Sequence, residues 1–181
     1  MNIPNSLSVF RLMLIPTFVI VFFMPQSNSY LIAGFIFLLS GITDFLDGYI
    51  ARKFGLITDL GKVLDPLADK LTQFTVFYCL WMKNIIPLWA VCIYIVKEVV
   101  MLVGGTSIYN KNKIVVASKW YGKVATALFY AGVMVVLLFD LSADIKRYII
   151  FGALAATVFA FLMYIITYFK LITTKNKSQK T

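Results

Sequence analysis

The stretch DFLDGYIARKFGLITDLGKVLDPLAD, residues 44–69, holds five of the eight acidic residues in a chain of 181. The remainder is strongly apolar, since 61% of all residues are hydrophobic, only 14% are charged and the mean hydropathy is +0.87. This composition lies outside the range of soluble globular proteins and predicts an integral membrane protein. Acids inside such a chain are functional-site candidates, because a charged side chain at mid-bilayer costs about 2.5 to 3.5 kcal/mol on insertion scales.

The spacing of these acids predicts two acidic helix faces. Asp44 and Asp47 lie three residues apart, and Asp65 and Asp69 lie four apart, so each pair shares one face of a helix. Two neighbouring helices would then point four carboxylates into one space. Carboxylates gathered that closely cannot all stay ionised unless a cation neutralises them. An all-oxygen set in a chain without histidine suits a hard cation, so we expect two divalent ions, Mg²⁺ or Mn²⁺.

Three small residues and one arginine accompany the acids. Gly48, Ala51 and Gly61 leave the backbone bare on the acidic faces, so that a ligand or a neighbouring helix can approach closely. Arg52 adds a planar set of donors suited to phosphate. The stretch therefore combines a predicted metal site with a predicted site for a phosphate-bearing ligand.

Acids, small residues and arginine form one pattern with eight specified positions. It reads Asp44-x-x-Asp47-Gly48-x-x-Ala51-Arg52, then eight residues, then Gly61-x-x-x-Asp65-x-x-x-Asp69. At every fixed position and every spacer it resembles the signature of the CDP-alcohol phosphotransferases, integral membrane enzymes of phospholipid synthesis. The resemblance implies that an alcohol displaces CMP from a CDP-linked lipid, with two divalent cations as cofactors and a homodimer as the assembly.

The resemblance also implies roles for single residues. The metal-site acids would be Asp44, Asp47, Asp65 and Asp69. Asp69 would also be the general base that deprotonates the attacking hydroxyl. Binding of the CDP portion is implied for five positions: Asp47, Gly48, Ala51, Arg52 and Gly61. Asp59 lies off the pattern, and we interpret it as a helix cap or a solvated loop acid.

Two other stretches point to the acceptor alcohol. The opening MNIPNSLSVFR, residues 1–11, and SKWYGKVAT, residues 118–126, resemble one branch of the family, the bacterial phosphatidylglycerophosphate synthases. On this resemblance we expect CDP-diacylglycerol and glycerol 3-phosphate as substrates. Another acceptor, such as serine or an inositol phosphate, stays open as an alternative.

The residues that bind the acceptor phosphate are less clearly marked. Lys123 matches the first lysine of a Gly-Lys-x-Lys-Thr stretch in that branch, but Ala125 stands where a second lysine is common. Lys97-Glu98 stands where Arg-Glu is common. Lys119 could supply the missing charge, so Lys119 and Lys123 are the candidates for this role.

The apolar stretches predict an all-α integral membrane fold with six transmembrane helices in one domain, residues 1–172. The predicted spans cover approximately residues 9–24, 30–51, 62–82, 86–107, 119–139 and 148–172. We expect a short N-terminal segment at the membrane surface and a basic polar tail over residues 173–181. Lys and Arg concentrate beside the second and fourth connections and at the carboxyl end. The positive-inside rule therefore predicts a multi-pass cell-membrane protein with both termini and the acidic site facing the cytoplasm.

Two other classes of function remain possible on these residues. The carboxylates could form the permeation site of a divalent-cation transporter, or the chain could be a non-catalytic membrane scaffold. The Gly-x-x-Ala-Arg element argues against the transporter, which does not need it. The net charge of +9 indicates membrane lipid headgroups and phosphate-bearing ligands. Because no nucleic-acid-binding module accompanies this charge, we expect no nucleic-acid partner.

Overall fold

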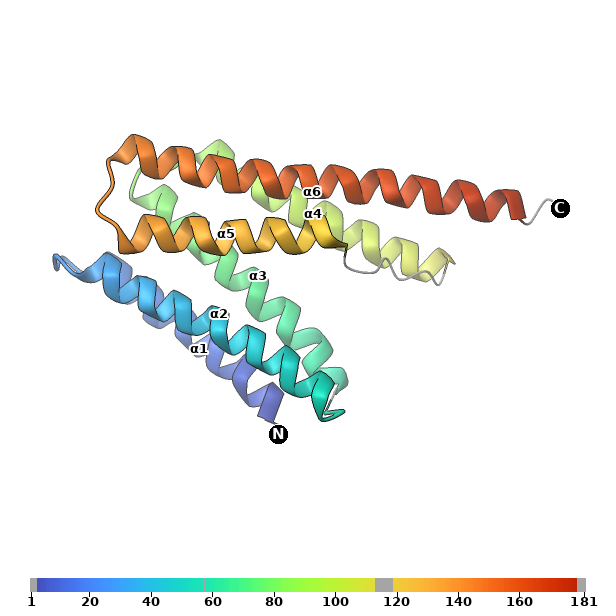
Figure 1. Cartoon of the computed structure of the whole chain (residues 1–181), viewed down its shortest axis with the longest axis horizontal. Helices are drawn as coiled ribbons and strands as arrows, with labels where there is room; N and C mark the ends of the chain where they lie inside the picture. Colours follow the sequence, from blue (N-terminus) through green and yellow to red (C-terminus); the bar gives the residue numbers. More distant parts are fainter. Residues whose placement is uncertain (1–2, 57, 113–118, 179–181) are drawn as a thin grey trace.

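The computed structural model describes residues 3–56, 58–112 and 119–178, and over these residues the chain is helical with no strand (Figure 1). The described ranges contain six helices: α1 (Ile3–Phe23), α2 (Ser29–Lys53), α3 (Asp59–Met82), α4 (Leu88–Asn112), α5 (Trp120–Leu138) and α6 (Ala143–Ser178). The predicted all-α fold and the number of helices are confirmed.

The helices form one bundle in which successive helices run in opposite directions (Figure 1). α1 packs against α2 and α3, α5 packs against α2 and α6, and α4 packs against α3 and α6. The beginning of α1, the end of α2 and the beginning of α3 therefore meet at one end of the bundle. All four predicted metal-site acids belong to that end.

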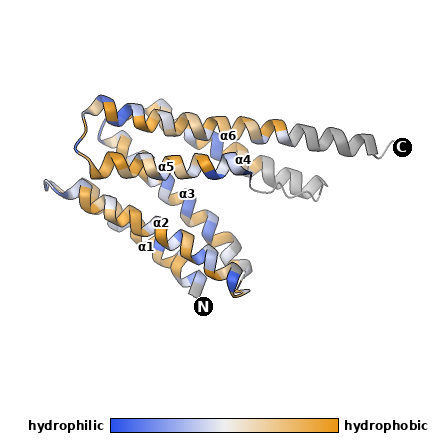
Figure 2. Ribbon diagram, in the orientation of Figure 1, coloured by the Kyte–Doolittle hydropathy of each residue, from blue (hydrophilic) through white to orange (hydrophobic). Residues whose placement is uncertain are grey.

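Four helices in the described parts of the chain are long and apolar enough to cross a membrane. They are Pro4–Phe23, Ser29–Ala51, Trp120–Leu138 and Ala143–Thr167. Figure 2 shows apolar residues over most of their length, whereas α3 carries several hydrophilic positions. An integral membrane protein is confirmed, and membrane spans over α3 and α4 stay predictions.

Helix boundaries differ from the predicted ones at the two ends of the chain. α1 begins at Ile3, so the described part of the segment expected at the membrane surface is continuous with the first span. Pro4 suits that position, because the first helical turn does not need its missing N–H. α6 continues to Ser178, so residues 173–178 of the predicted polar tail are helical, and residues 179–181 lie outside the described residues.

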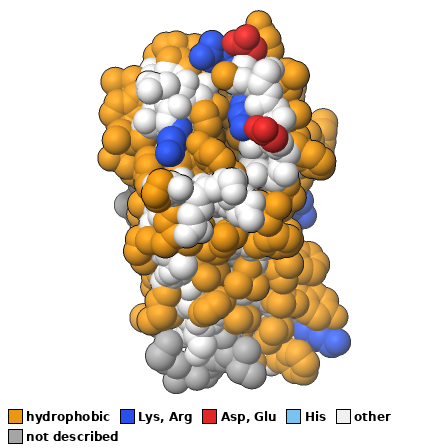
Figure 3. All heavy atoms as spheres, turned by 90° about the vertical axis from the view of Figure 1, so that its left-hand side faces the viewer, with side chains coloured by type: hydrophobic (Ala, Val, Ile, Leu, Met, Phe, Trp, Pro, Cys, Tyr) orange, Lys and Arg blue, Asp and Glu red, His pale blue; other side chains and the backbone are white. Residues whose placement is uncertain are grey.

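The main apolar core occupies the half of the bundle away from the acids. Its aromatic side chains stack closely, with Phe77 between Tyr94 and Phe129 at ring-centroid distances of 4.5 Å and 5.3 Å. Figure 3 faces the far end of this half, where apolar side chains cover most of the surface and charged ones gather in the upper part. Aromatic packing thus holds one half of the bundle, and a different kind of contact must hold the other.

A tight connection sets α3 beside α2. Gly55 follows the end of α2 with φ +65°, a conformation that glycine adopts without a steric penalty. The N–H of Leu56 then donates to the carbonyl of Ala51 at 3.0 Å, which closes the helix end. Thr58, rather than the predicted Asp59, caps α3, because its hydroxyl accepts from the N–H of Gly61 at 3.0 Å. The two acidic helices are therefore joined by only five residues.

Candidate functional site

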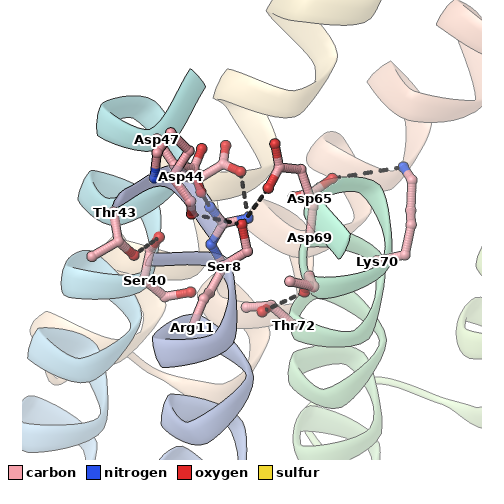
Figure 4. Close-up of polar contacts among 12 residues, drawn as sticks. Ser8, Arg11, Ser40, Thr43, Asp44, Asp47, Asp65, Asp69, Lys70 and Thr72 are labelled. Atoms are coloured by element: carbon pink, nitrogen blue, oxygen red, sulfur yellow. Dashed lines mark hydrogen bonds and ion pairs between the residues drawn. The ribbon is translucent and has the colours of Figure 1, made fainter. Parts of the chain in front are cut away.

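The four predicted metal-site acids lie along the facing sides of α2 and α3. Figure 4 shows Asp44 and Asp47 on α2 and Asp65 on α3 turned toward the space between the two helices. Asp47 is buried, with 1% of its surface exposed, while the other three are partly exposed. Asp44 is close enough to interact electrostatically with both Asp65 and Asp69. The two stripes inferred from the sequence thus form one acidic cluster, which we define as these four aspartates.

Arg11 of α1 lies against the acidic cluster from beneath (Figure 4). Its side chain is fully buried, and its Nη1 lies 2.6 Å from Oδ1 of Asp44. Its Nη2 donates to Oδ2 of Asp47. Sequence reasoning did not assign Arg11 to the site. Its single positive charge faces two of the four carboxylates.

Two more polar residues of α1 point to the same region. The hydroxyl of Ser8 donates to Oδ1 of Asp65, and Oδ1 of Asn5 accepts from the hydroxyl of Thr58 at 2.9 Å. A Cβ added at Gly61 would lie 2.8 Å from Oδ1 of Asn5, so only glycine lets α1 approach the first turn of α3 this closely. Asn5, Ser8 and Arg11 recur every three residues in a mainly apolar helix, a spacing that could have indicated them in advance.

Asp69 is held by donors from its own helix and from α5. Its Oδ1 accepts from Nε2 of Gln73 at 2.8 Å and from the hydroxyl of Tyr130 at 3.1 Å. Gln73 is fixed in turn, because its Oε1 accepts from the hydroxyl of Tyr94 at 2.9 Å. Nζ of Lys70 lies 3.9 Å from the other oxygen, Oδ2. Asp69 is therefore oriented through Oδ1, and Oδ2 has the weaker contact.

A second group of charges lies beside Asp69, between α3 and α4. Glu98 is buried and forms ion pairs with Lys97 and, at 3.0 Å, with Lys70. Lys97 and Glu98 are adjacent on α4 and pair with each other. Lys70 lies between this group of charges and the acidic cluster, because it pairs with Glu98 and also lies near Asp69.

A cavity of about 670 Å³ opens between α2 and α5 next to the acidic cluster. Asp44 and Lys123 are its charged lining residues, and nearly all the others are apolar or small, among them Leu38, Phe45 and Met134. A cavity of this kind can hold hydrocarbon with a polar group at the aspartate and lysine. It also brings Lys123 near the metal-site acids, as an acceptor-phosphate residue would require.

The other predicted site residues are less closely tied to the cluster. Lys119 is exposed, and its backbone N–H donates to the hydroxyl of Tyr164 at 2.9 Å. Gly48 and Ala51 lie on α2 in the last turns before the connection. The side chain of Arg52 lies outside the described residues.

The acidic cluster fits hard divalent cations by the chemistry of its donors. Within the residues that the structure describes, no three carboxylates or thiols lie close enough together to share an ion. The guanidinium of Arg11 instead spans the two acids of α2. Four carboxylates from two helices supply only hard oxygen ligands, which suit Mg²⁺ or Mn²⁺.

Comparison with known proteins indicates the same family as the acidic pattern does. A family model described as CDP-alcohol phosphatidyltransferase matches residues 1–173. A Rickettsia felis protein named CDP-diacylglycerol–glycerol-3-phosphate 3-phosphatidyltransferase is 33% identical over 167 residues, covering 92% of each chain. A Bacillus subtilis protein of the same name is 31% identical over 159 residues, covering 81% of this chain and 82% of its own. One from Haemophilus influenzae is 52% identical over 69 residues, or 38% of this chain and 37% of its own.

Proposed function

Because the chain belongs to the CDP-alcohol phosphatidyltransferase family, we propose that it transfers the phosphatidyl group of CDP-diacylglycerol to glycerol 3-phosphate. The products are phosphatidylglycerophosphate and CMP. The observation that carries this choice of substrates is the name shared by relatives that align along most of the chain. The acidic pattern, residues 44–69, lies within the region that the family model matches.

Asp44, Asp47, Asp65 and Asp69 would hold the two divalent cations. Bound there, the ions would neutralise the diphosphate of the nucleotide-lipid and stabilise the departing phosphate of CMP. The CDP portion would lie beside the small residues of the pattern, Gly48, Ala51 and Gly61, with Arg52 as a phosphate donor. Gly61 also admits Asn5 to the first turn of α3, so its small size serves packing as well.

Asp69 is the residue that we assign as general base. It would take the proton from the hydroxyl of the acceptor as that oxygen attacks phosphorus in line with the bond to CMP. Gln73 and Tyr130 both donate to Oδ1, which leaves Oδ2 as the oxygen with room for the proton.

The cavity between α2 and α5 suits the lipid part of the donor. Its lining is nearly all apolar, and Asp44 brings it into contact with the acidic cluster. The acyl chains of CDP-diacylglycerol could lie there while the diphosphate reaches the carboxylates. Lys123, in the same lining, and Lys119, at the start of α5, are the residues that we propose for the phosphate of the acceptor.

The distribution of basic residues supports a cytoplasmic orientation for the site and for both termini. Soluble glycerol 3-phosphate would then reach the acids from the cytoplasm. A homodimer in the cell membrane is proposed on the family resemblance.

The test is a panel of acceptors scored by release of CMP. Purified protein is given CDP-diacylglycerol, Mg²⁺ or Mn²⁺, and glycerol 3-phosphate, serine or an inositol phosphate in turn. We expect release with glycerol 3-phosphate alone and none from an Asp69→Asn variant. Release with another acceptor only would replace the proposed substrate. Metal flux into vesicles without any release of CMP would support a cation transporter instead.

A further inference from the structure

Arg11 is a buried cation whose ion pairs, among the residues that the structure describes, go to two acids of the predicted metal site. It is fully buried near the middle of the apolar helix α1, where a lone charge would be strongly unfavourable. Its ion pairs go to Asp44 and Asp47. Its Nε has no hydrogen-bond partner among the described residues. The two carboxylates are therefore what holds the guanidinium in place.

The same carboxylates cannot serve a guanidinium and divalent ions equally well. Arg11 uses Oδ1 of Asp44 and Oδ2 of Asp47. An ion bound by these residues needs their oxygens and repels the positive charge of Arg11 at close range. Each acid has a second oxygen that Arg11 does not contact in these pairs, but the repulsion weakens the ion pairs of Arg11 when metal binds. The free energy lost from those pairs lowers the affinity for metal.

We propose that Arg11 is an internal counter-cation that competes with divalent ions for Asp44 and Asp47. Without metal, it neutralises part of the acidic cluster and keeps α1 and α2 packed at the polar end of the bundle. When ions bind, they take over that role, and Arg11 gives up part of its hold on the two acids. The inference rests on the proposed function, because it assumes that the acidic cluster binds divalent cations.

The test is direct measurement of Mn²⁺ binding to the full-length protein in detergent, read from the electron paramagnetic resonance signal of free Mn²⁺. We expect Arg11→Met to bind Mn²⁺ about tenfold more tightly than the wild type, within the range of about 5 to 150-fold typical of coupled sites. Arg11→Lys keeps one positive charge without the planar fork, so its dissociation constant should lie between the two. Arg147→Met is the matched control, since Arg147 lies at the other end of the bundle and contacts the carbonyl of Ile85.

Thermal unfolding supplies a second measurement that does not depend on activity. In EDTA, Arg11→Met should unfold at a lower temperature than the wild type, and Mn²⁺ should remove most of that difference. An Arg11→Met protein that folds but binds Mn²⁺ no more tightly than the wild type overturns the proposal. So does one that fails to fold even in Mn²⁺, because ions should replace the charge of Arg11. A wild type that binds no Mn²⁺ refutes the metal site itself, which separates failure of the proposed function from failure of this inference.

Discussion

The hydrogen bond from Tyr130 to Asp69 offers the sharpest test of the assignment of the base. Tyr130→Phe deletes one hydroxyl, while the ring stays stacked on Phe37 at a centroid distance of 4.9 Å. The lost bond of 3.1 Å goes to a charged acceptor, and such bonds contribute about 1.5 to 3 kcal/mol. Gln73 still donates to the same oxygen, so we take the lower value, about 1.5 kcal/mol. If the bond orients Asp69 in the transition state, kcat should fall by about tenfold.

The assay is release of CMP from CDP-diacylglycerol and glycerol 3-phosphate by detergent-purified protein, with kcat and both KM values measured. Tyr121→Phe is the matched control, because it deletes a hydroxyl on the same helix that bonds Thr167 at 3.2 Å and faces α6. The control should keep its kcat within about twofold. A kcat for Tyr130→Phe no lower than that of the control would show that the bond does not support catalysis. The structure would then give no reason to assign Asp69 as an oriented base.

Three further predictions concern the rest of the bundle. Glu98→Leu leaves Lys97 and Lys70 without their shared partner, so the free energy of unfolding should fall by about 3 to 5 kcal/mol. Denaturant unfolding in detergent measures this loss, and adding Lys97→Met should restore part of the stability. Gly122→Ala would set a Cβ 2.6 Å from the hydroxyl of Tyr164, so the contact between α5 and α6 should be strained and the unfolding free energy lowered by about 1 to 3 kcal/mol. EDTA should abolish release of CMP by the wild type, and either Mg²⁺ or Mn²⁺ should restore it, whereas activity that persists in EDTA would contradict the metal site.

Local patterns in the sequence were enough to predict the two acidic faces and the helices that carry them. A helix has a fixed period, so the spacing of Asp44 and Asp47, and of Asp65 and Asp69, sets which side chains share a face. The short connection at Gly55 then keeps the end of α2 and the beginning of α3 at the same end of the bundle, where α1 packs against both helices. For these four acids, the prediction needed no knowledge of how the rest of the chain packs.

The partners of the acids could not be predicted in the same way, because they come from distant parts of the chain. Arg11 is 36 positions from Asp47, and Tyr130 is 61 positions from Asp69. Each of these partners lies in a mainly apolar helix, and periodicity does not say which helix it meets. The side chain of Arg11 is fully buried against Asp44 and Asp47, a position that the local sequence does not indicate.

The two halves of the bundle depend on different forces, and this difference has a consequence for function. Stacked rings such as Phe77 and Phe129 hold the half away from the acids, and packing of that kind does not change when ions bind. At the acidic end, contacts between α1, α2 and α3 run through charged and polar groups, with Arg11 and Ser8 reaching the aspartates. The arrangement of this end should therefore vary with the occupancy of the carboxylates, while the other half stays fixed. A site built this way can adjust to divalent ions and a nucleotide-lipid without loosening the fold that carries it.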